Sequence, residues 1–373
     1  MIRQYTPKNP WRWLAIAAIL ALVAAGGWFA GTRFGQPQAA QAAAGYDIGD
    51  AGKPKPTGQV REFQLVAKEA PWEIAPGVTV PAITYNGQVP GPLIRVTEGD
   101  TIRVTIKNEL KQATAIHWHG LHVPNAMDGV PPVTQPPIEP GQSFTYEFPA
   151  SHAGTFMYHS HLNAVEQIDR GMYGPLIIDP ATPPPARFDK EFTMVLSAWD
   201  TTAMPTSQHT MPGGADMQGQ SAGMGGMSMN YNYFTINGKA YPANEAWTVK
   251  EGDLVRVRLI NISNLTHPMH LHGGDFTVVA KNGEPIRPER QETVNTISLD
   301  AGEIYDVVFR ADNPGTWVFH CHELHHTEND GVEPGGLIQV IQYEGYTPPS
   351  TSAAPAAPAA PTAMPMNMPG MTH

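Results

Sequence analysis

Cysteine is almost absent from this sequence, whose 373 residues include only Cys321. A lone thiol cannot form a disulfide within its own chain, so a disulfide-stapled fold is excluded. Charged residues are also scarce, at 15%, and the net charge of -11 argues against a partner such as nucleic acid. Glycine and proline are instead abundant, with 36 and 37 residues, and Val, Ile and Thr occur in many short runs. This combination favours a turn-rich, all-β protein.

One long apolar run exists, from Trp13 to Gly31, with basic residues before it and Arg33 after it. Its length is close to the roughly 20 residues that span a bilayer as a helix. We therefore predict an uncleaved membrane anchor with its basic end in the cytoplasm. The alternative is a signal peptide cleaved near the Ala-Gln-Ala at 40–42. Both interpretations predict an exported protein, on the periplasmic or extracellular side of the membrane.

The rest of the chain consists of short β-patterned runs separated by Gly, Pro and Asn turns. The proline-rich stretch Pro180–Pro185 interrupts this pattern and predicts a domain boundary. An Ala/Gln/Gly/Pro-rich linker precedes the β pattern, and an Ala/Pro-rich tail follows it. The predicted organisation is an N-terminal anchor or signal (1–33), a linker (34–58), a first domain (59–180), a second domain (190–345) with a methionine-rich loop (204–230), and a disordered tail (346–373).

The two predicted domains share short stretches of similar sequence. Glu98–Asp100 and Glu251–Asp253 both read Glu-Gly-Asp and precede an alternating β run. Likewise, Tyr85–Gly87 and Ile236–Gly238 both end in Asn-Gly after a β run. We infer two copies of one β-sandwich, each large enough to enclose its own core.

Most of the fifteen histidines fall into four tight clusters, two in each predicted domain. In a strand, residues i and i+2 face the same side about 6.6 Å apart, so paired imidazoles can share a metal centre. In His320-Cys321-His322 the thiol faces away from both histidines. A metal bound by the thiol would therefore be connected, through a few backbone bonds, to a metal bound by the histidines. The clusters comprise His117 and His119; His159 and His161; His267, His270 and His272; and His320, Cys321, His322, His325 and His326.

A single histidine is more often a structural residue than a ligand, and one His-X-His pair could be a zinc site. Neither structural histidines nor a single zinc pair explains four clusters that include one thiolate. Neutral imidazoles combined with a single soft thiolate, without a carboxylate, suit copper.

These motifs resemble the four signatures of the multicopper oxidases, and flanking segments such as Ile83–Leu93 and Tyr173–Asp179 agree. The resemblance implies an all-β fold of two cupredoxin-like Greek-key β-sandwich domains and four coppers: one type 1, one type 2 and a type 3 pair. It assigns His267, Cys321 and His326 to type 1 copper, His117 and His270 to type 2, and His119, His159, His161, His272, His320 and His322 to the type 3 pair.

Residues near the motifs allow further hypotheses. Asp128, nine residues after His119, is either a general acid that supplies protons to bound oxygen or an ordinary Asp-Gly turn residue. We expect His122 to support a copper ligand and His152 and His325 to be bystanders. The family's axial type 1 residue, ten positions after the cysteine, is here Gly331, so we expect no axial ligand and Val332 as a filler of the gap.

The resemblance further implies one-electron oxidation of a substrate coupled to the four-electron reduction of O2 to water. With two domains, each supplying half of a trinuclear site, it implies a homotrimer in which neighbouring subunits complete each other's sites. Soft thioethers favour Cu(I), so two methionine-rich segments suggest a cuprous oxidase. The alternatives are a laccase acting on phenols or aromatic amines and a copper-sequestering surface protein without turnover. The methionines are Met204, Met211, Met217, Met224, Met227 and Met229 in the loop, and Met364, Met366, Met368 and Met371 in the tail.

Overall fold

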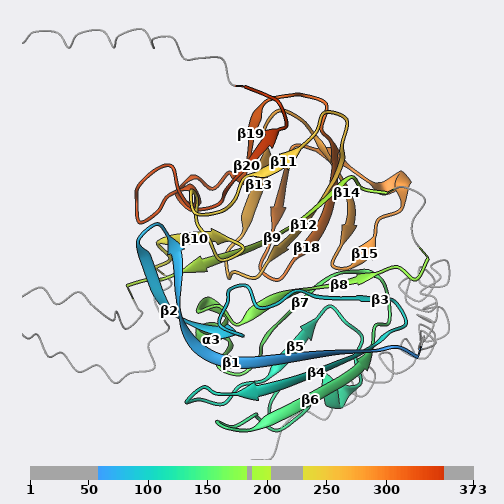
Figure 1. Ribbon diagram of the computed structural model, residues 1–373, viewed down its shortest axis with the longest axis vertical. Coiled ribbons are helices and arrows are strands. Elements are labelled where there is room, and N and C mark those ends of the chain that lie inside the picture. The colour runs from blue at the N-terminus through green and yellow to red at the C-terminus, as the bar shows by residue number, and fades with distance from the viewer. Residues whose placement is uncertain (1–57, 183–186, 203–229, 348–373) are drawn as a thin grey trace, which may run out of the picture. The chain divides into compact units, whose positions relative to one another are not determined.

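The computed structural model describes residues 58–182, 187–202 and 230–347 (Figure 1). None of the helices within these ranges is long and apolar enough to cross a membrane. The predicted anchor, almost all of the linker and methionine-rich loop, and nearly the whole predicted tail lie outside the described residues.

The first sandwich consists of two four-stranded sheets formed by strands up to Asp179. One sheet has the order β2-β1-β4-β6 and the other β3-β8-β7-β5. In β4 burial alternates, and Ile102, Val104 and Ile106 point inward, whereas β7 and β8 are buried on both faces. The strands are β1 (Val60–Ala75), β2 (Val78–Tyr85), β3 (Ile94–Thr97), β4 (Thr101–Asn108), β5 (Ile116–His119), β6 (Ser143–Pro149), β7 (Gly154–Ser160) and β8 (Tyr173–Asp179). Helix α3 (Ala164–Asp169) joins β7 to β8.

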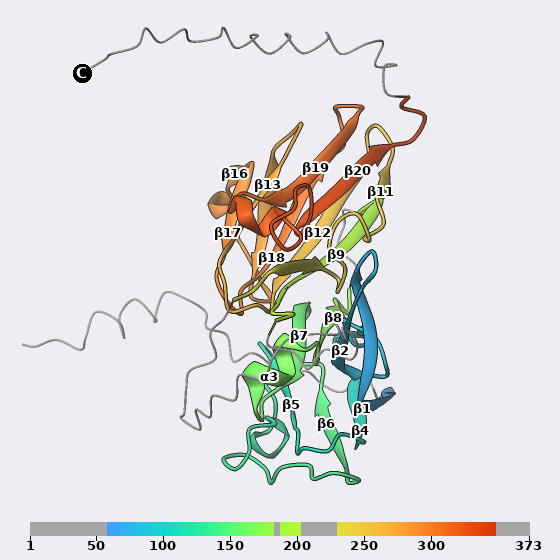
Figure 2. The same ribbon diagram turned by 90° about the vertical axis from the view of Figure 1, so that its left-hand side faces the viewer.

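The second sandwich again has two sheets, one ordered β10-β9-β12-β18-β14-β15 with β16 paired to β14, and one ordered β11-β20-β19-β13-β17. Figure 2 shows these strands from the side. The strands are β9 (Lys190–Trp199), β10 (Tyr233–Ile236), β11 (Trp247–Val249), β12 (Leu254–Asn261), β13 (His267–Leu271), β14 (Phe276–Lys281), β15 (Glu284–Pro285), β16 (Thr293–Val294), β17 (Thr296–Leu299), β18 (Ile304–Arg310), β19 (Thr316–Cys321) and β20 (Ile338–Tyr343). Three short 3-10 helices, η1 (Asn125–Met127), η2 (Pro288–Arg290) and η3 (Leu324–Thr327), complete the described elements.

The Asn-Gly stretches that recur in the sequence have the same local structure in both sandwiches. Asn86 and Asn237 both have a left-handed backbone, with φ of 60° and 52°. Each side chain accepts a hydrogen bond from the antiparallel neighbour of the strand that ends at the turn: from Val66 N–H of β1 in the first sandwich (2.6 Å) and from Val195 N–H of β9 in the second (2.9 Å). Asn tolerates this backbone conformation and forms such bonds readily, which explains why the dipeptide Asn-Gly recurs. The all-β architecture of two cupredoxin-like sandwiches is as predicted.

A buried seam joins the two sandwiches. An apolar cluster takes residues such as Ile74 and Tyr173 from the first and Trp199 and Ile260 from the second. Next to it, Thr155 Oγ1 of β7 donates to the Asp306 carboxylate of β18 (2.6 Å). The seam therefore fixes β7, which carries the predicted metal ligand His159, against the second sandwich.

Candidate metal centres

The predicted type 1 ligands His267, Cys321 and His326 converge inside the second sandwich. The two Nδ1 atoms of the histidines lie 3.1 Å apart, and the Cys321 Sγ lies 3.8 Å from His267 Nδ1 and 3.5 Å from His326 Nδ1. All three residues are buried. Three donors at these separations can share one metal ion at about 2.0–2.3 Å from each.

Strand pairing and local hydrogen bonds create this arrangement. Strands β13 and β19 are antiparallel, with Met269 opposite Cys321, so His267 and Cys321 face the same core. Ser263 Oγ lies 2.7 Å from His267 Nε2 and thereby leaves Nδ1 for the metal. The buried Phe234 ring packs on the His326 ring at 4.2 Å. Neither contact was predicted from the sequence: Ser263 precedes His267 by four residues but lies outside the histidine motif, and Phe234 lies on another strand, β10.

The electrostatics of the site fit a metal with soft and imidazole ligands. Burial lowers the pKa of His267 to about 3 and that of His326 to about 4, so both imidazoles are neutral at pH 7. Burial raises the pKa of the Cys321 thiol to about 12 in the metal-free protein. A thiolate is stable here only with a cation beside it, so metal binding must displace the thiol proton. Neutral imidazoles with one thiolate match copper.

The expectation that Val332 fills the gap at the axial position is wrong. Val332 is 66% exposed and does not fill a gap in the buried site. The fully buried Leu337 occupies the neighbourhood instead: its carbonyl accepts the Cys321 N–H (3.1 Å) and its own N–H donates to the His326 carbonyl (2.9 Å). The spacing of ten residues after the cysteine misled, because Leu337 lies sixteen residues after Cys321. An aliphatic side chain beside the two ligands adds no donor.

We expect Leu337→Met to lower the reduction potential of a copper bound at this site. The thioether would supply a weak additional ligand, which stabilises Cu(II) relative to Cu(I). A spectroelectrochemical titration measures the effect, with Leu337→Ile as the control of similar volume. An unchanged potential in Leu337→Met would place the axial position elsewhere.

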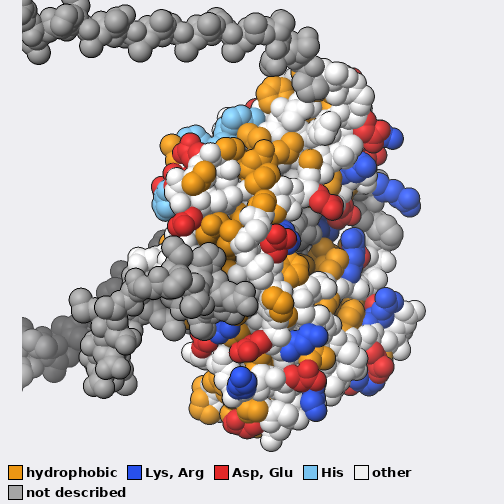
Figure 3. All heavy atoms as spheres, turned by 60° about the vertical axis from the view of Figure 1, so that its left-hand side comes forward, with side chains coloured by type: hydrophobic (Ala, Val, Ile, Leu, Met, Phe, Trp, Pro, Cys, Tyr) orange, Lys and Arg blue, Asp and Glu red, His pale blue; other side chains and the backbone are white. Residues whose placement is uncertain are grey.

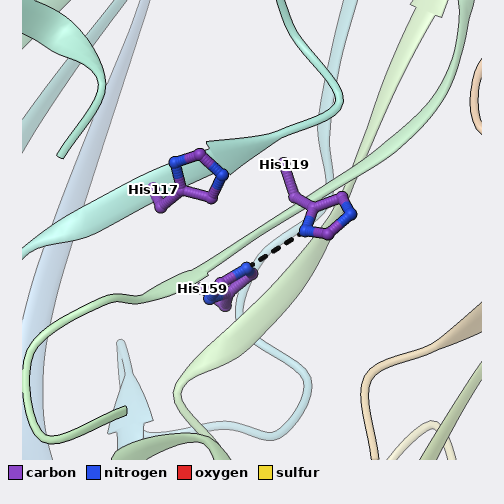
Figure 4. Close-up of side chains that lie close together, drawn as sticks. All are labelled: His117, His119 and His159. Carbon is purple, nitrogen blue, oxygen red and sulfur yellow. Dashed lines mark hydrogen bonds between the residues drawn. The ribbon is translucent and has the colours of Figure 1, made fainter. Parts of the chain in front are cut away.

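A second set of histidines gathers on the first sandwich, where β5 and β7 pair with His117 opposite His159. His119 Nδ1 lies 3.4 Å from His159 Nε2, as Figure 4 shows, and the His161 ring is 5.4 Å from that of His117. His117 Nδ1 donates to the Asp128 carbonyl (2.9 Å) and His159 Nδ1 to the Ser160 carbonyl (2.9 Å), so each ring keeps Nε2 for a metal. Burial lowers the pKa of His159 to about 3 and also lowers that of His119.

The structure places Asp128 directly beside this set. Its carboxylate oxygen Oδ1 lies 3.4 Å from His117 Nδ1. The next residue, Gly129, has φ of 81°, and a Cβ there would overlap the Ile116 carbonyl of β5. Only glycine therefore allows the turn to pass so close to the strand, which is what holds Asp128 against His117.

A third set lies on the outer face of β13 and β19. His270 stands opposite His320 in the strand pair, and His272 Nε2 lies 3.0 Å from His320 Nε2. The His322 ring lies 5.6 Å from that of His270. His272 and His322 are exposed, and Figure 3 shows histidine side chains at the surface of the second sandwich. These imidazoles are open to a partner, unlike the buried triad.

The two halves of the predicted trinuclear site are separate in one chain. Among the described residues, every close pair of rings from these sets lies within one set: His117, His119, His159 and His161, or His270, His272, His320 and His322. The His119 ring packs instead against the turn at Gly302, in the second sandwich of the same chain. A Cβ on Gly302 would lie 3.3 Å from this ring.

The buried triad and the outer set are connected through Cys321. Cys321 is completely buried while its neighbour His322 is exposed, so the two side chains lie on opposite sides of the backbone. His320 Nδ1 donates to the Cys321 carbonyl (2.8 Å), which adds a hydrogen bond to the covalent connection.

Comparison with known proteins identifies the family of this chain. Two multicopper oxidase family models match residues 66–183 and 206–332. The chain belongs to the multicopper oxidases. The solved structure of the multicopper oxidase mgLAC is 39% identical, with a TM-score of 0.70, and the match covers 79% of this chain and 89% of that one. The blue copper oxidase from Nitrosomonas europaea is 36% identical with a TM-score of 0.68, covering 77% and 86%.

Among curated relatives, Copper resistance protein A of Pseudomonas syringae pv. tomato is 32% identical, over 66% of this multicopper oxidase and 45% of the relative. The chain spans about half the length of the curated relatives it matches.

Proposed function

We propose that this multicopper oxidase takes electrons singly from a reducing substrate and passes four of them to O2, forming water. The observation that carries the proposal is the position of Cys321, a buried thiol within 3.8 Å of two neutral imidazoles and flanked by two histidines of another set. Copper bound to these residues supplies the one-electron chemistry. The proposed complement is one type 1, one type 2 and two type 3 ions per chain, held by the eleven ligands named from the sequence.

The chain's own residues have separable roles in this scheme. His267, Cys321 and His326 hold one ion away from water, and the buried Phe234 and Leu337 exclude solvent from it. The peptide bonds around Cys321, together with the His320 hydrogen bond, form the route toward the second site. The outer set keeps its imidazoles at the surface, where another subunit can add the missing half.

We further propose a homotrimer in which the first-sandwich set of one subunit meets the outer set of the next. The separation of the two sets within one chain supports this arrangement. A head-to-tail contact that closes after three copies would complete every site and leave none unpaired.

Asp128 is proposed to supply protons during O2 reduction, because its carboxylate is 3.4 Å from His117 and partly open to solvent. We expect Asp128→Asn to slow steady-state O2 consumption by about 100-fold. Anaerobic bleaching of the blue absorption by substrate should be unaffected, since that step needs no proton from Asp128. Asp128→Glu should restore part of the rate. An Asn variant with wild-type turnover would leave Asp128 as a turn residue.

For the substrate we propose Cu(I), on the basis of the methionine-rich segments and of relatives named for copper resistance. Oxygen uptake by the copper-loaded protein should be compared for Cu(I), Fe(II) and a phenol. Replacing the six loop methionines by Ser should lower the rate with Cu(I) at least tenfold and spare phenol oxidation. Replacing six loop Ser, Gln and Gly residues by Ala is the matched control. Equal loss with both substrates would refute a specific cuprous role and favour the phenol oxidase alternative.

We also propose that the protein is exported and stays attached to the membrane through residues 13–31, as their apolar composition suggests. Fractionation of expressing cells tests this: the protein should sediment with membranes and be released when residues 1–33 are exchanged for a cleavable signal peptide.

A further inference from the structure

Two histidines outside the copper sets lie together at the edge of the first sandwich. His122 follows β5 in an exposed loop, and His152 precedes β7 with 21% of its side chain exposed. Their ring centroids are 5.1 Å apart. This spacing lies within the range of the ligand pairs described above, from 4.8 Å for His267 and His326 to 5.6 Å for His270 and His322. Two imidazoles at this distance can bind one ion.

A carboxylate from the second sandwich lies beside His152. Glu284, the first residue of β15, places Oε1 3.8 Å from His152 Nε2. Ligand atoms around a tetrahedral ion are about 3.3 Å apart. The side chains of His122 and Glu284 are both exposed, and they must turn toward His152 before all three can surround one ion. The backbone is closely fixed here, because a Cβ on Gly154 would lie 2.5 Å from the Gly283 carbonyl oxygen.

His152 has the hydrogen bonding and protonation state of a metal ligand. Its Nδ1 lies 3.0 Å from Ser151 Oγ, which leaves Nε2 to face Glu284. Burial lowers the pKa of His152, so the ring is neutral at pH 7 and can bind an ion without losing a proton. The carboxylates of Glu284 and Glu98 both act on this ring and make the surroundings favourable for a cation.

We propose that His122, His152 and Glu284 form an additional site for a divalent cation of borderline softness, such as Zn²⁺ or Cu²⁺, separate from the copper centres. Two imidazoles, one carboxylate and water suit such an ion. Because Glu284 belongs to the second sandwich and the histidines to the first, the bound ion links the two sandwiches and stabilises their association.

The test is Zn²⁺ binding to the copper-loaded protein, in which the copper centres are already filled. Equilibrium dialysis followed by metal analysis should find about one additional Zn²⁺ per chain, and Zn²⁺ should raise the midpoint of thermal unfolding by roughly 2–4 °C. The His122 ring packs against His152, which is not one of the proposed copper ligands. His122→Ala should therefore lose this zinc while keeping its copper and blue absorption. His152→Ala should behave in the same way, and Glu284→Gln should weaken binding at least tenfold.

His325→Ala is the matched control, since this histidine is 59% exposed and its ring nitrogen likewise lies near a glutamate, Glu323. It should retain the additional zinc and the thermal shift. The proposal is overturned if the copper-loaded wild type binds no additional Zn²⁺, if the His122 and His152 variants keep it, or if His325→Ala removes it. None of these outcomes depends on oxidase turnover, so they are independent of the proposed function.

Discussion

Cys321→Ser is expected to abolish the intense blue absorption and to reduce O2 uptake by more than about 100-fold, a loss of at least about 2.7 kcal/mol in transition-state stabilisation. The serine hydroxyl is a hard, weakly acidic ligand. It cannot replace a thiolate beside two imidazoles whose Nδ1 atoms lie 3.1 Å apart. The variant should also bind about one copper fewer per chain. Absorption spectroscopy, metal analysis and an oxygen electrode measure the three effects.

The informative control is His272→Ala, which removes a ligand of the outer set and leaves the buried triad intact. This variant should keep the blue absorption, and substrate should bleach it normally, while O2 uptake is lost. If Cys321→Ser remains blue, or if both variants lose the same spectral bands, the division into a buried entry site and a separate oxygen site is wrong.

Mixing two inactive variants is expected to restore activity if the sets meet between subunits. His161→Ala impairs the first-sandwich set and His272→Ala the outer set, and both altered residues are exposed, so folding should be preserved. In a randomly mixed trimer, one interface in four combines an intact first-sandwich set with an intact outer set. Co-expression in equal amounts should therefore give about one quarter of wild-type turnover per chain, against almost none for either variant alone.

A mixture of His161→Ala with His117→Ala serves as the control, because both changes fall in the same set and no interface can be complete. This mixture should remain inactive. Failure of the first mixture to recover, in particles shown to contain both variants, would mean that one chain assembles its whole oxygen site by itself.

The short β-patterned runs correctly predicted an all-β protein, but no local pattern indicates β1 as one long strand. Val60–Ala75 includes Pro71, several charged residues and an irregular register between Glu73 and Ala75, and these features weaken the β pattern. The strand forms because β2 and β4 both pair with it, which is a long-range contact that no local window reveals. The two Asn-Gly turns, by contrast, were recognisable since their requirement is local.

For the metal centres, the sequence identified residue types and spacing, and the structure brings the predicted buried ligands His267, Cys321 and His326 together. The neighbours that control them were not predictable. Leu337 lies sixteen residues after Cys321 in the sequence, and Phe234 comes from a different sheet. His152, which we expected to be a bystander, lies near Glu284 of the other sandwich through a contact between Gly154 and Gly283 that has no sequence motif.

The buried seam limits how this chain can be divided or recombined. Ile74, Tyr173 and Trp199 each have at most 1% of their surface exposed, because the opposite sandwich covers them. A fragment ending after residue 182 would expose the first two to water and should aggregate when produced alone. Neither half is thus a portable module, and chimaeras made with relatives must exchange both sides of this apolar contact together.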